Sequence, residues 1–327
     1  MQRTLTASEI IRQPTHPIYR RLGDRIFQVI VVLLGISIIA LALLLAEVLF
    51  VDGREPLRRF GFFGFLTGTT WDPVRGEHGT LPFIVGTLIT AIASLTLSFF
   101  PALGVAIFSA EYAPRWLASI IDTIVDLLAA IPSVVVGIWG IFVLVPLMQN
   151  RVYLPVYFWA FENAPQLLPV LGPPAGYNLV TATIVLALMI VPYTTALARD
   201  AIRLVPRSQR EAARALGATR WEVMRMAVLP YARGAIVAGA ILSFGRAIGE
   251  TMAVAMLVGN SNTLPFTLFG PAATMPSVIV NEFREAVEDL HLASLMAVGF
   301  YLFLISLVVN LIAAWLQRKL AVGGRAL

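Results

Sequence analysis

Cysteine is absent from this sequence, lysine occurs once and histidine three times. The absence of cysteine excludes disulfides, thiolate metal sites and a cysteine nucleophile. The histidines, His16, His78 and His291, are far apart in the sequence, so no metal site is expected. Because the single lysine is Lys319, the chain has no G-x-x-x-x-G-K-[ST] phosphate loop, and any ATP hydrolysis is expected in another chain.

Charge is also scarce, since 13% of the 327 residues are charged, whereas soluble proteins carry about 25%. Hydrophobic residues make up 58% of the chain, and the mean hydropathy is +0.81. Most of the surface is therefore expected to face lipid. A helix needs about 20 apolar residues to cross a bilayer core. We predict an all-α polytopic membrane protein with six transmembrane helices, at residues 26–50, 82–110, 118–148, 178–198, 234–258 and 292–316.

The basic residues predict the orientation of these helices. Lys and Arg number 17 in the segments on the side of the two termini and 6 in the segments on the other side. This bias predicts that both termini are cytoplasmic, and it explains the net charge of +5 without nucleic acid as a partner. The first apolar run is too long for a signal peptide, so an uncleaved helix is expected. The predicted organisation is a cytoplasmic segment 1–25, a first helix 26–50, an outer loop 51–81, a five-helix core 82–317 with an inner loop 199–233, and a cytoplasmic tail 318–327.

The inner loop 199–233 has the signals of two short helices. Ser208 and Thr219 each stand three residues before a glutamate, the spacing of a capping box. Gly217 lies between them, where a left-handed residue would end the first helix, and Pro230 is expected to stop the second. An amphipathic helix pair that lies on the membrane surface and contacts anionic lipid is the structural alternative to a functional role.

The fifth predicted helix contains two ionisable residues, Arg246 and Glu250, spaced one turn apart on one face. Arg246 would lie about 18 Å along the helix from its inner end, close to the middle of the bilayer. Insertion of a charged side chain at that depth costs about 3 kcal/mol, so an ionisable residue there is expected to serve a function. A transport pathway is one interpretation, because a planar guanidinium suits an oxyanion. A salt bridge that serves packing or subunit pairing is the alternative.

Two aspartates, Asp122 and Asp126, share a face near the start of the third predicted helix. Ser119 and Asp122 have the spacing of a capping pair, so we expect a structural role for Asp122. Asp126 lies one turn deeper and is a candidate partner for an arginine on another helix.

Six residues of the inner loop, at fixed spacing, resemble the E-A-A-x-x-x-G-x₉-I-x-L-P signature of ABC importer permeases, and only the isoleucine position differs, where this chain has Ala227. In that family the segment is the coupling helix that docks on a separate ATPase subunit, which agrees with the missing phosphate loop. The resemblance implies a role in ATPase coupling for Glu211, Ala212, Ala213, Gly217, Leu229 and Pro230.

Further stretches are similar to the permeases of the phosphate-specific transport (Pst) system and are most like their C-type subunit. They lie at residues 63–68, 71–73, 81–87, 128–135 and 245–252. The resemblance implies the type I ABC importer (MetI-like) permease fold, a location in the prokaryotic inner membrane, and a permease that imports inorganic phosphate without catalytic residues. Arg246, Glu250 and Thr251 would line the substrate pathway.

The resemblance also implies a set of partners. These are a second permease (PstA-like) in a heterodimer, two ATPase subunits (PstB-like), a phosphate-binding protein (PstS-like) and membrane lipid. ATP and Mg would bind to the ATPase subunits, so this chain is expected to hold no cofactor. Two alternatives remain at this point: an ABC importer of another oxyanion, such as molybdate or sulfate, and an ion-coupled secondary transporter, for which no convincing internal repeat is seen. A membrane-embedded enzyme is not favoured, because no nucleophile, base or metal set converges.

Overall fold

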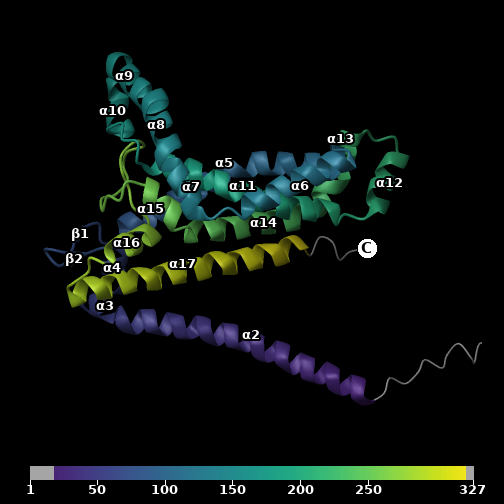
Figure 1. Ribbon diagram of the computed structural model, residues 1–327, viewed down its shortest axis with the longest axis horizontal. Helices are drawn as coiled ribbons and strands as arrows, with labels where there is room; N and C mark the ends of the chain where they lie inside the picture. The colour runs from purple at the N-terminus through teal and green to yellow at the C-terminus, as the bar shows by residue number, and fades with distance from the viewer. Residues whose placement is uncertain (1–17, 322–327) are drawn as a thin grey trace, which may run out of the picture. The chain divides into compact units, whose positions relative to one another are not determined.

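The computed structural model of this protein describes residues 18–321, which are mainly helical (Figure 1). The chain divides into two compact units, Met1–Val51 and Asp52–Leu327. The expected segments 1–25 and 318–327 lie mostly outside the described residues. The first unit contains α2 (Ile18–Asp52) except for its last residue. The elements of the second unit are, in chain order, α3 (Arg54–Phe60), α4 (Phe62–Thr67), β1 (Trp71–Asp72), β2 (Glu77–His78), α5 (Leu81–Ile107), η1 (Phe108–Tyr112), α6 (Arg115–Ala129), α7 (Ser133–Trp139), η2 (Gly140–Leu144), α8 (Val145–Met148), η3 (Gln149–Tyr153), α9 (Leu154–Asn163), η4 (Pro165–Leu167), α10 (Leu168–Leu171), α11 (Leu179–Arg203), α12 (Arg207–Ala215), α13 (Arg220–Val223), η5 (Met224–Val228), α14 (Leu229–Gly249), α15 (Met252–Leu257), α16 (Met275–Glu282) and α17 (Asp289–Ala321).

Six helical segments of the described residues are long and apolar enough to cross a membrane. The first, Gly23–Asp52, is apolar on all sides, and most of its side chains are exposed. A helix of that kind is stable in lipid, because water would have to hydrate its whole apolar surface. The other five are Leu81–Tyr112, Ser133–Asn163, Leu179–Arg203, Arg220–Gly249 and Asp289–Leu316. The predicted number of spans is confirmed, and the boundaries of the third and fifth are corrected.

Helix α11 lies at the centre of the second unit and packs against α5, α14, α6 and α15. It begins at Asn178, whose side-chain oxygen accepts a hydrogen bond of 2.8 Å from the backbone N–H of Thr181. Val185, Leu186 and Ile190 are fully buried in the largest apolar cluster. Their burial makes α11 the element against which the other helices are positioned.

The third predicted span, 118–148, is wrong because the helix breaks in its middle. Helix α6 ends at Ala129, and α7 starts at Ser133 after Pro132. Proline lacks an N–H and disfavours helical backbone at the residue before it, here Ile131, so the helix cannot continue through this point. The apolar span that remains is Ser133–Asn163, and α6 is a separate helix.

The fifth predicted span, 234–258, is wrong at both ends. The helical segment runs from Arg220 to Gly249, and the π-helical turn η5 (Met224–Val228) joins α13 to α14. Pro230 therefore does not stop a helix, since it directly follows the π-helical turn, a local adjustment that accommodates the missing N–H of a proline inside a membrane helix. The helix ends before Glu250, whose ψ of 121° is extended.

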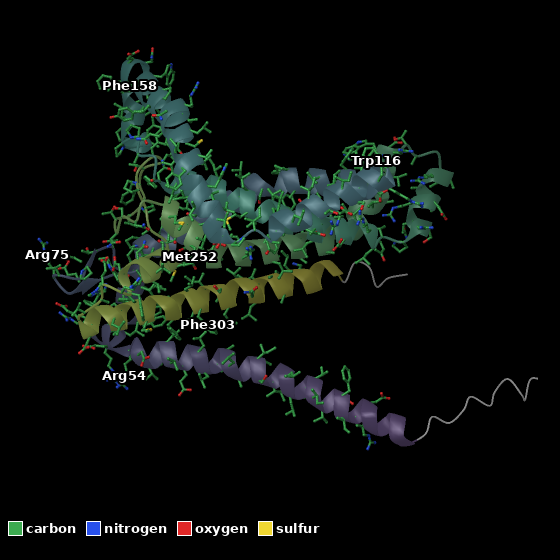
Figure 2. The ribbon with its side chains drawn as sticks, in the orientation of Figure 1. Arg54, Arg75, Trp116, Phe158, Met252 and Phe303 are labelled. Carbon is green, nitrogen blue, oxygen red and sulfur yellow. The ribbon has the colours of Figure 1, made fainter. Side chains whose placement is uncertain are left out.

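The two ends of the second unit carry different elements. Helices α12 and α13 lie at one end, together with Trp116 at the start of α6 (Figures 1 and 2). Phe158 on α9 lies at the opposite end (Figure 2). The inner loop and the α8–α10 region are thus separated by the length of the spans, as a membrane crossing requires.

Candidate functional site

A pocket of about 490 Å³ opens between α6, α7, α11 and α14. Among residues 18–321, Arg246 of α14 is the one charged residue that lines it. The other lining residues are mostly apolar: Leu128, Ala129, Ile131, Val135, Val136, Trp139, Leu188, Met189, Val191, Pro192 and Tyr193. The helix break at Pro132 helps to form the pocket, because it separates α6 from α7 at the pocket wall. A single cation in an apolar surface is an arrangement that attracts anions.

Tyr193 of α11 supports the guanidinium of Arg246. The Cζ atom of Arg246 lies 4.1 Å from the centre of the Tyr193 ring, a cation–π contact. The Tyr193 hydroxyl donates a hydrogen bond of 3.3 Å to the carbonyl oxygen of Ala129, the last residue of α6. The ring is therefore tied to the broken end of α6, and it covers one face of the guanidinium.

Arg246 forms no ion pair within residues 18–321, and its buried Nε has no hydrogen-bond partner there. A buried donor that lacks a partner costs about 1–3 kcal/mol. Because one face of the guanidinium lies on Tyr193, the N–H groups at its edge remain available to an oxyanion.

Glu250 does not share a helix face with Arg246, contrary to the sequence-based prediction. Helix α14 has ended, and Glu250 is a buried residue in extended conformation at the break before α15. No cationic partner for Glu250 occurs in the described part of the chain. Thr251 Oγ1 donates to the carbonyl oxygen of Gly249 at 3.1 Å, and Met252 begins α15 just beyond (Figure 2). Broken helices of this kind expose backbone groups at membrane depth, where they can contact a substrate.

The inner loop forms a short helix, α12, that is followed by a turn at Gly217, as predicted, but the second predicted short helix is wrong, because α13 continues through η5 into α14. Gly217 has a φ of +86°, a left-handed conformation that favours glycine. Thr219 forms the predicted capping box with Glu222. The expected box at Ser208 is wrong, because α12 already begins at Arg207 after Pro206, so that Ser208 lies within the first turn.

The signature residues of this loop differ in exposure. Glu211, Ala212, Gly217 and Pro230 are exposed, whereas Ala213 and Leu229 are half-buried and pack against the apolar cluster under the loop. Helix α12 thus keeps an exposed face that carries Glu211 and Ala212, and a second face turned to the membrane domain. A docking role for the exposed face stays a prediction.

Asp122 belongs to a charge cluster that the sequence did not reveal. Its carboxylate lies 3.1 Å from Arg199 and 2.8 Å from Arg203, both on α11, and it accepts a 2.7 Å hydrogen bond from Ser109. Asp122 is not the capping residue expected, since α6 begins seven residues earlier at Arg115. Asp126 faces Arg199 at 3.8 Å, so its arginine neighbour is on α11 and not in the pocket.

Two histidines that are distant in the sequence meet in the folded chain. The rings of His78 and His291 are 5.8 Å apart, and His291 pairs with Glu282 at 2.9 Å. Burial, and then the neighbouring His291, lower the pKa of His78 from 6.5 to about 4. Glu282 also accepts a hydrogen bond of 2.8 Å from Trp71. The described residues contain no group of three or more candidate ligands that could hold a metal ion. The cluster therefore attaches the β-hairpin to α16 and α17.

The fold is that of the membrane subunits of ABC importers. A chain of the MetNI methionine ABC transporter superposes with a TM-score of 0.57 at 16% identity, covering 77% of this chain and 99% of the other. A chain of a bacterial ABC transporter involved in the import of the polysaccharide alginate gives a TM-score of 0.58 at 18% identity, covering 91% and 99%. At such low identity these likenesses define the fold alone, and they confirm the predicted all-α permease fold.

The sequence relatives define the family. Residues 102–322 match the family of binding-protein-dependent transport system inner membrane components. Three proteins similar to this chain are named phosphate transport system permease protein PstC, the last of them with the word probable. They come from Mesorhizobium japonicum (40% identity, 91% of each chain), Haemophilus influenzae (42%, 85% of this chain and 89% of the other) and Methanocaldococcus jannaschii (34%, 83% and 86%). The chain belongs to the binding-protein-dependent inner membrane components and, within them, to the family of these PstC permeases. It is a multi-pass inner-membrane transport subunit.

Proposed function

We propose that this chain is the permease subunit of an ATP-driven inorganic phosphate importer, in which it forms half of the translocation pathway. The observation that carries the proposal is Arg246, at the wall of an apolar pocket, whose guanidinium forms no ion pair among the described residues and whose buried Nε has no hydrogen-bond partner there. The phosphate transport relatives at about 40% identity support the choice of substrate.

The chemistry of the pocket suits brief contact with an oxyanion. The guanidinium presents donors in a planar fork that matches phosphate oxygens. The apolar walls of the pocket strengthen this attraction, because few competing dipoles surround it. Buried Glu250, near the end of the same helix, would limit the attraction so that phosphate is released. Thr251 at the helix break would offer a hydroxyl to the passing anion.

The remainder of the assembly is part of the proposal. A second permease (PstA-like) would close the pathway, and a phosphate-binding protein (PstS-like) would deliver phosphate at the outer side. Two ATPase subunits (PstB-like) would bind ATP and Mg and contact α12 through Glu211 and Ala212. The termini would be cytoplasmic, in agreement with the excess of arginine in the segments on their side. Co-purification from membranes with a second permease and an ATPase would support this assembly, and recovery of the chain alone would argue against it.

Replacement of Arg246 tests the proposed function. We expect Arg246→Ala to abolish phosphate uptake into cells that express the full complex, while the complex still assembles. Arg233→Ala is the matched control, because Arg233 is exposed on the same helix. Uptake of sulfate or molybdate instead of phosphate by the unmodified complex would favour the other oxyanions. Normal phosphate uptake by Arg246→Ala would refute the pathway role.

A further inference from the structure

Arg210 of α12 makes contacts that neither the signature nor the pocket explains. Its Nε donates to Oε1 of Glu111 at 2.8 Å, and its Nη2 lies 2.6 Å from the same oxygen. Nη2 also donates to the carbonyl oxygen of Ile202 at 2.8 Å, and Nη1 donates to that of Val205. All three nitrogens of the guanidinium are thus used. The side chains of Arg210 and Glu111 are each only 15% exposed.

These acceptors belong to two different spans. Glu111 stands in η1, which continues α5 at the end nearest the inner loop. Ile202 lies in the last turn of α11, and Val205 follows it. The carbonyl oxygen of Ile202 also accepts a hydrogen bond of 3.2 Å from the backbone N–H of Val205, so Arg210 adds a second donor at this helix end and supplies a donor to the carbonyl oxygen of Val205. Arg210 therefore joins α12 to the ends of α5 and α11 at once.

The other residues of α12 pack only weakly against the membrane helices. None of its nine residues is buried, and Ala213 is the residue that contributes to the adjoining apolar cluster. The partly buried charged pair of Arg210 and Glu111, with its several hydrogen bonds, is correspondingly the firmest attachment available to this helix. It is also geometrically demanding, since the fork of an arginine meets all its acceptors only in one orientation.

Arg210 contacts the ends of α5 and α11, and α11 also lines the pocket. Helices α5 and α11 pack together along their length, and α11 carries Tyr193, on which Arg246 rests. A displacement of α12 would thus also move α11, which positions Arg246 through Tyr193.

We propose that Arg210 and Glu111 are positioning residues that transmit the movement of α12 to α5 and α11, and so couple ATP hydrolysis to opening of the pocket. The inference rests on the proposed function, because it assumes an ATPase that docks on α12. It predicts that the side chain of Arg210 rigidly connects α12 to α5 and α11. This connection is separate from the exposed face of α12 on which the ATPase would dock.

The test compares uptake with ATP hydrolysis in vesicles that contain the full complex. Arg210→Lys keeps the charge but loses the fork, and Glu111→Gln keeps the shape but loses the charge. We expect phosphate transported per ATP hydrolysed to fall about tenfold in each, the effect of one lost charge-assisted hydrogen bond. The double variant should be no worse than the single ones, because both remove the same link. Arg207→Lys, exposed on the same helix, is the control and should keep the ratio.

The ratio separates coupling from stability. A variant that is only less stable loses uptake and hydrolysis in proportion to the amount of complex, and its ratio stays constant. An unchanged ratio in Arg210→Lys and Glu111→Gln would overturn the proposal. Loss of assembly in both variants would also overturn it, because the pair would then serve folding. If Arg210→Lys alone fails to assemble, the ratio in Glu111→Gln decides.

A second measurement distinguishes this inference from the proposed function. A complex of the unmodified chain that takes up no phosphate would contradict the proposed function. In that case the link between Arg210 and Glu111 is tested by a different measurement. The rate of ATP hydrolysis is compared with and without the loaded binding protein at the outer side, in the unmodified complex and in Arg210→Lys. The same link would carry the effect of the binding protein to the ATPase subunits, so the stimulation should fall in Arg210→Lys. Full stimulation would refute the link.

Discussion

Replacement of Tyr193 isolates the contribution of the ring that supports Arg246. The Arg246 guanidinium lies 4.1 Å from the ring centre, within the range of a cation–π contact. Such a contact is worth about 1–2 kcal/mol when partly removed from water. The hydroxyl of Tyr193 contributes less, because its hydrogen bond to Ala129 is long at 3.3 Å and joins neutral groups.

Two substitutions separate these contributions. Tyr193→Phe keeps the ring and should leave phosphate uptake close to normal. Tyr193→Leu keeps an apolar side chain but removes the aromatic face, so the guanidinium loses its support. A loss of about 1–2 kcal/mol corresponds to a fall of about 5- to 30-fold in the kcat/KM of uptake.

The assay is initial phosphate uptake over a range of phosphate concentrations, normalised to assembled complex. Arg246→Ala provides the lower limit. If Tyr193→Leu transports at the normal rate, the ring does not position the guanidinium. If Tyr193→Phe falls as far as Tyr193→Leu, the hydroxyl and its link to α6 are the important feature, and the reasoning from the ring is refuted.

Two further predictions concern packing and pH. Gly86 of α5 lies against the backbone carbonyl of Ala273, which a Cβ would strongly overlap; Gly86→Ala should cost about 1–3 kcal/mol, read as a lower thermal midpoint of the purified complex. Gly104→Ala on the same helix has open space and should keep or raise the midpoint, and equal midpoints for the two variants would contradict this close approach. The pKa of His78 is about 4 when folded and 6.5 unfolded, so the unfolded chain binds more protons between these values. The contribution of His78 to stability should therefore be complete above pH 6.5 and should be lost as the pH is lowered toward 4. In the unmodified complex the thermal midpoint should fall over this pH range, and His78→Phe should reduce that fall. An equal fall in both proteins would show that His78 is not its source.

Local signals predicted the parts of the inner loop that depend on neighbouring residues. The left-handed backbone of Gly217 and the capping box of Thr219 were found because both depend on a few consecutive residues. Pro230 was misread, because a proline near a helix end favours a stop as much as a start. The π-helical turn η5 before Pro230 decides between the two readings, and no sequence pattern predicted it.

The pocket could be predicted only in part. Arg246 was identified because a charge in an apolar run is costly wherever it lies. Its separation from Glu250 was missed, because a regular helix was extended through a break that carries neither proline nor a run of glycines. Tyr193, like Arg210 and Glu111, gave no signal, since each acquires its role from a contact between distant segments.

The amino-acid sequence by itself determined that this chain lies in a membrane, crosses it with six apolar helices and carries an arginine within one of them. Those features follow from the cost of placing polar groups in lipid, which each segment meets separately. The tertiary structure alone decided that Tyr193 supports Arg246, that Asp122 pairs with α11, and that Arg210 joins three elements. These contacts depend on how helices distant in the sequence pack together, and the energy of such packing is shared among residues that no local pattern connects.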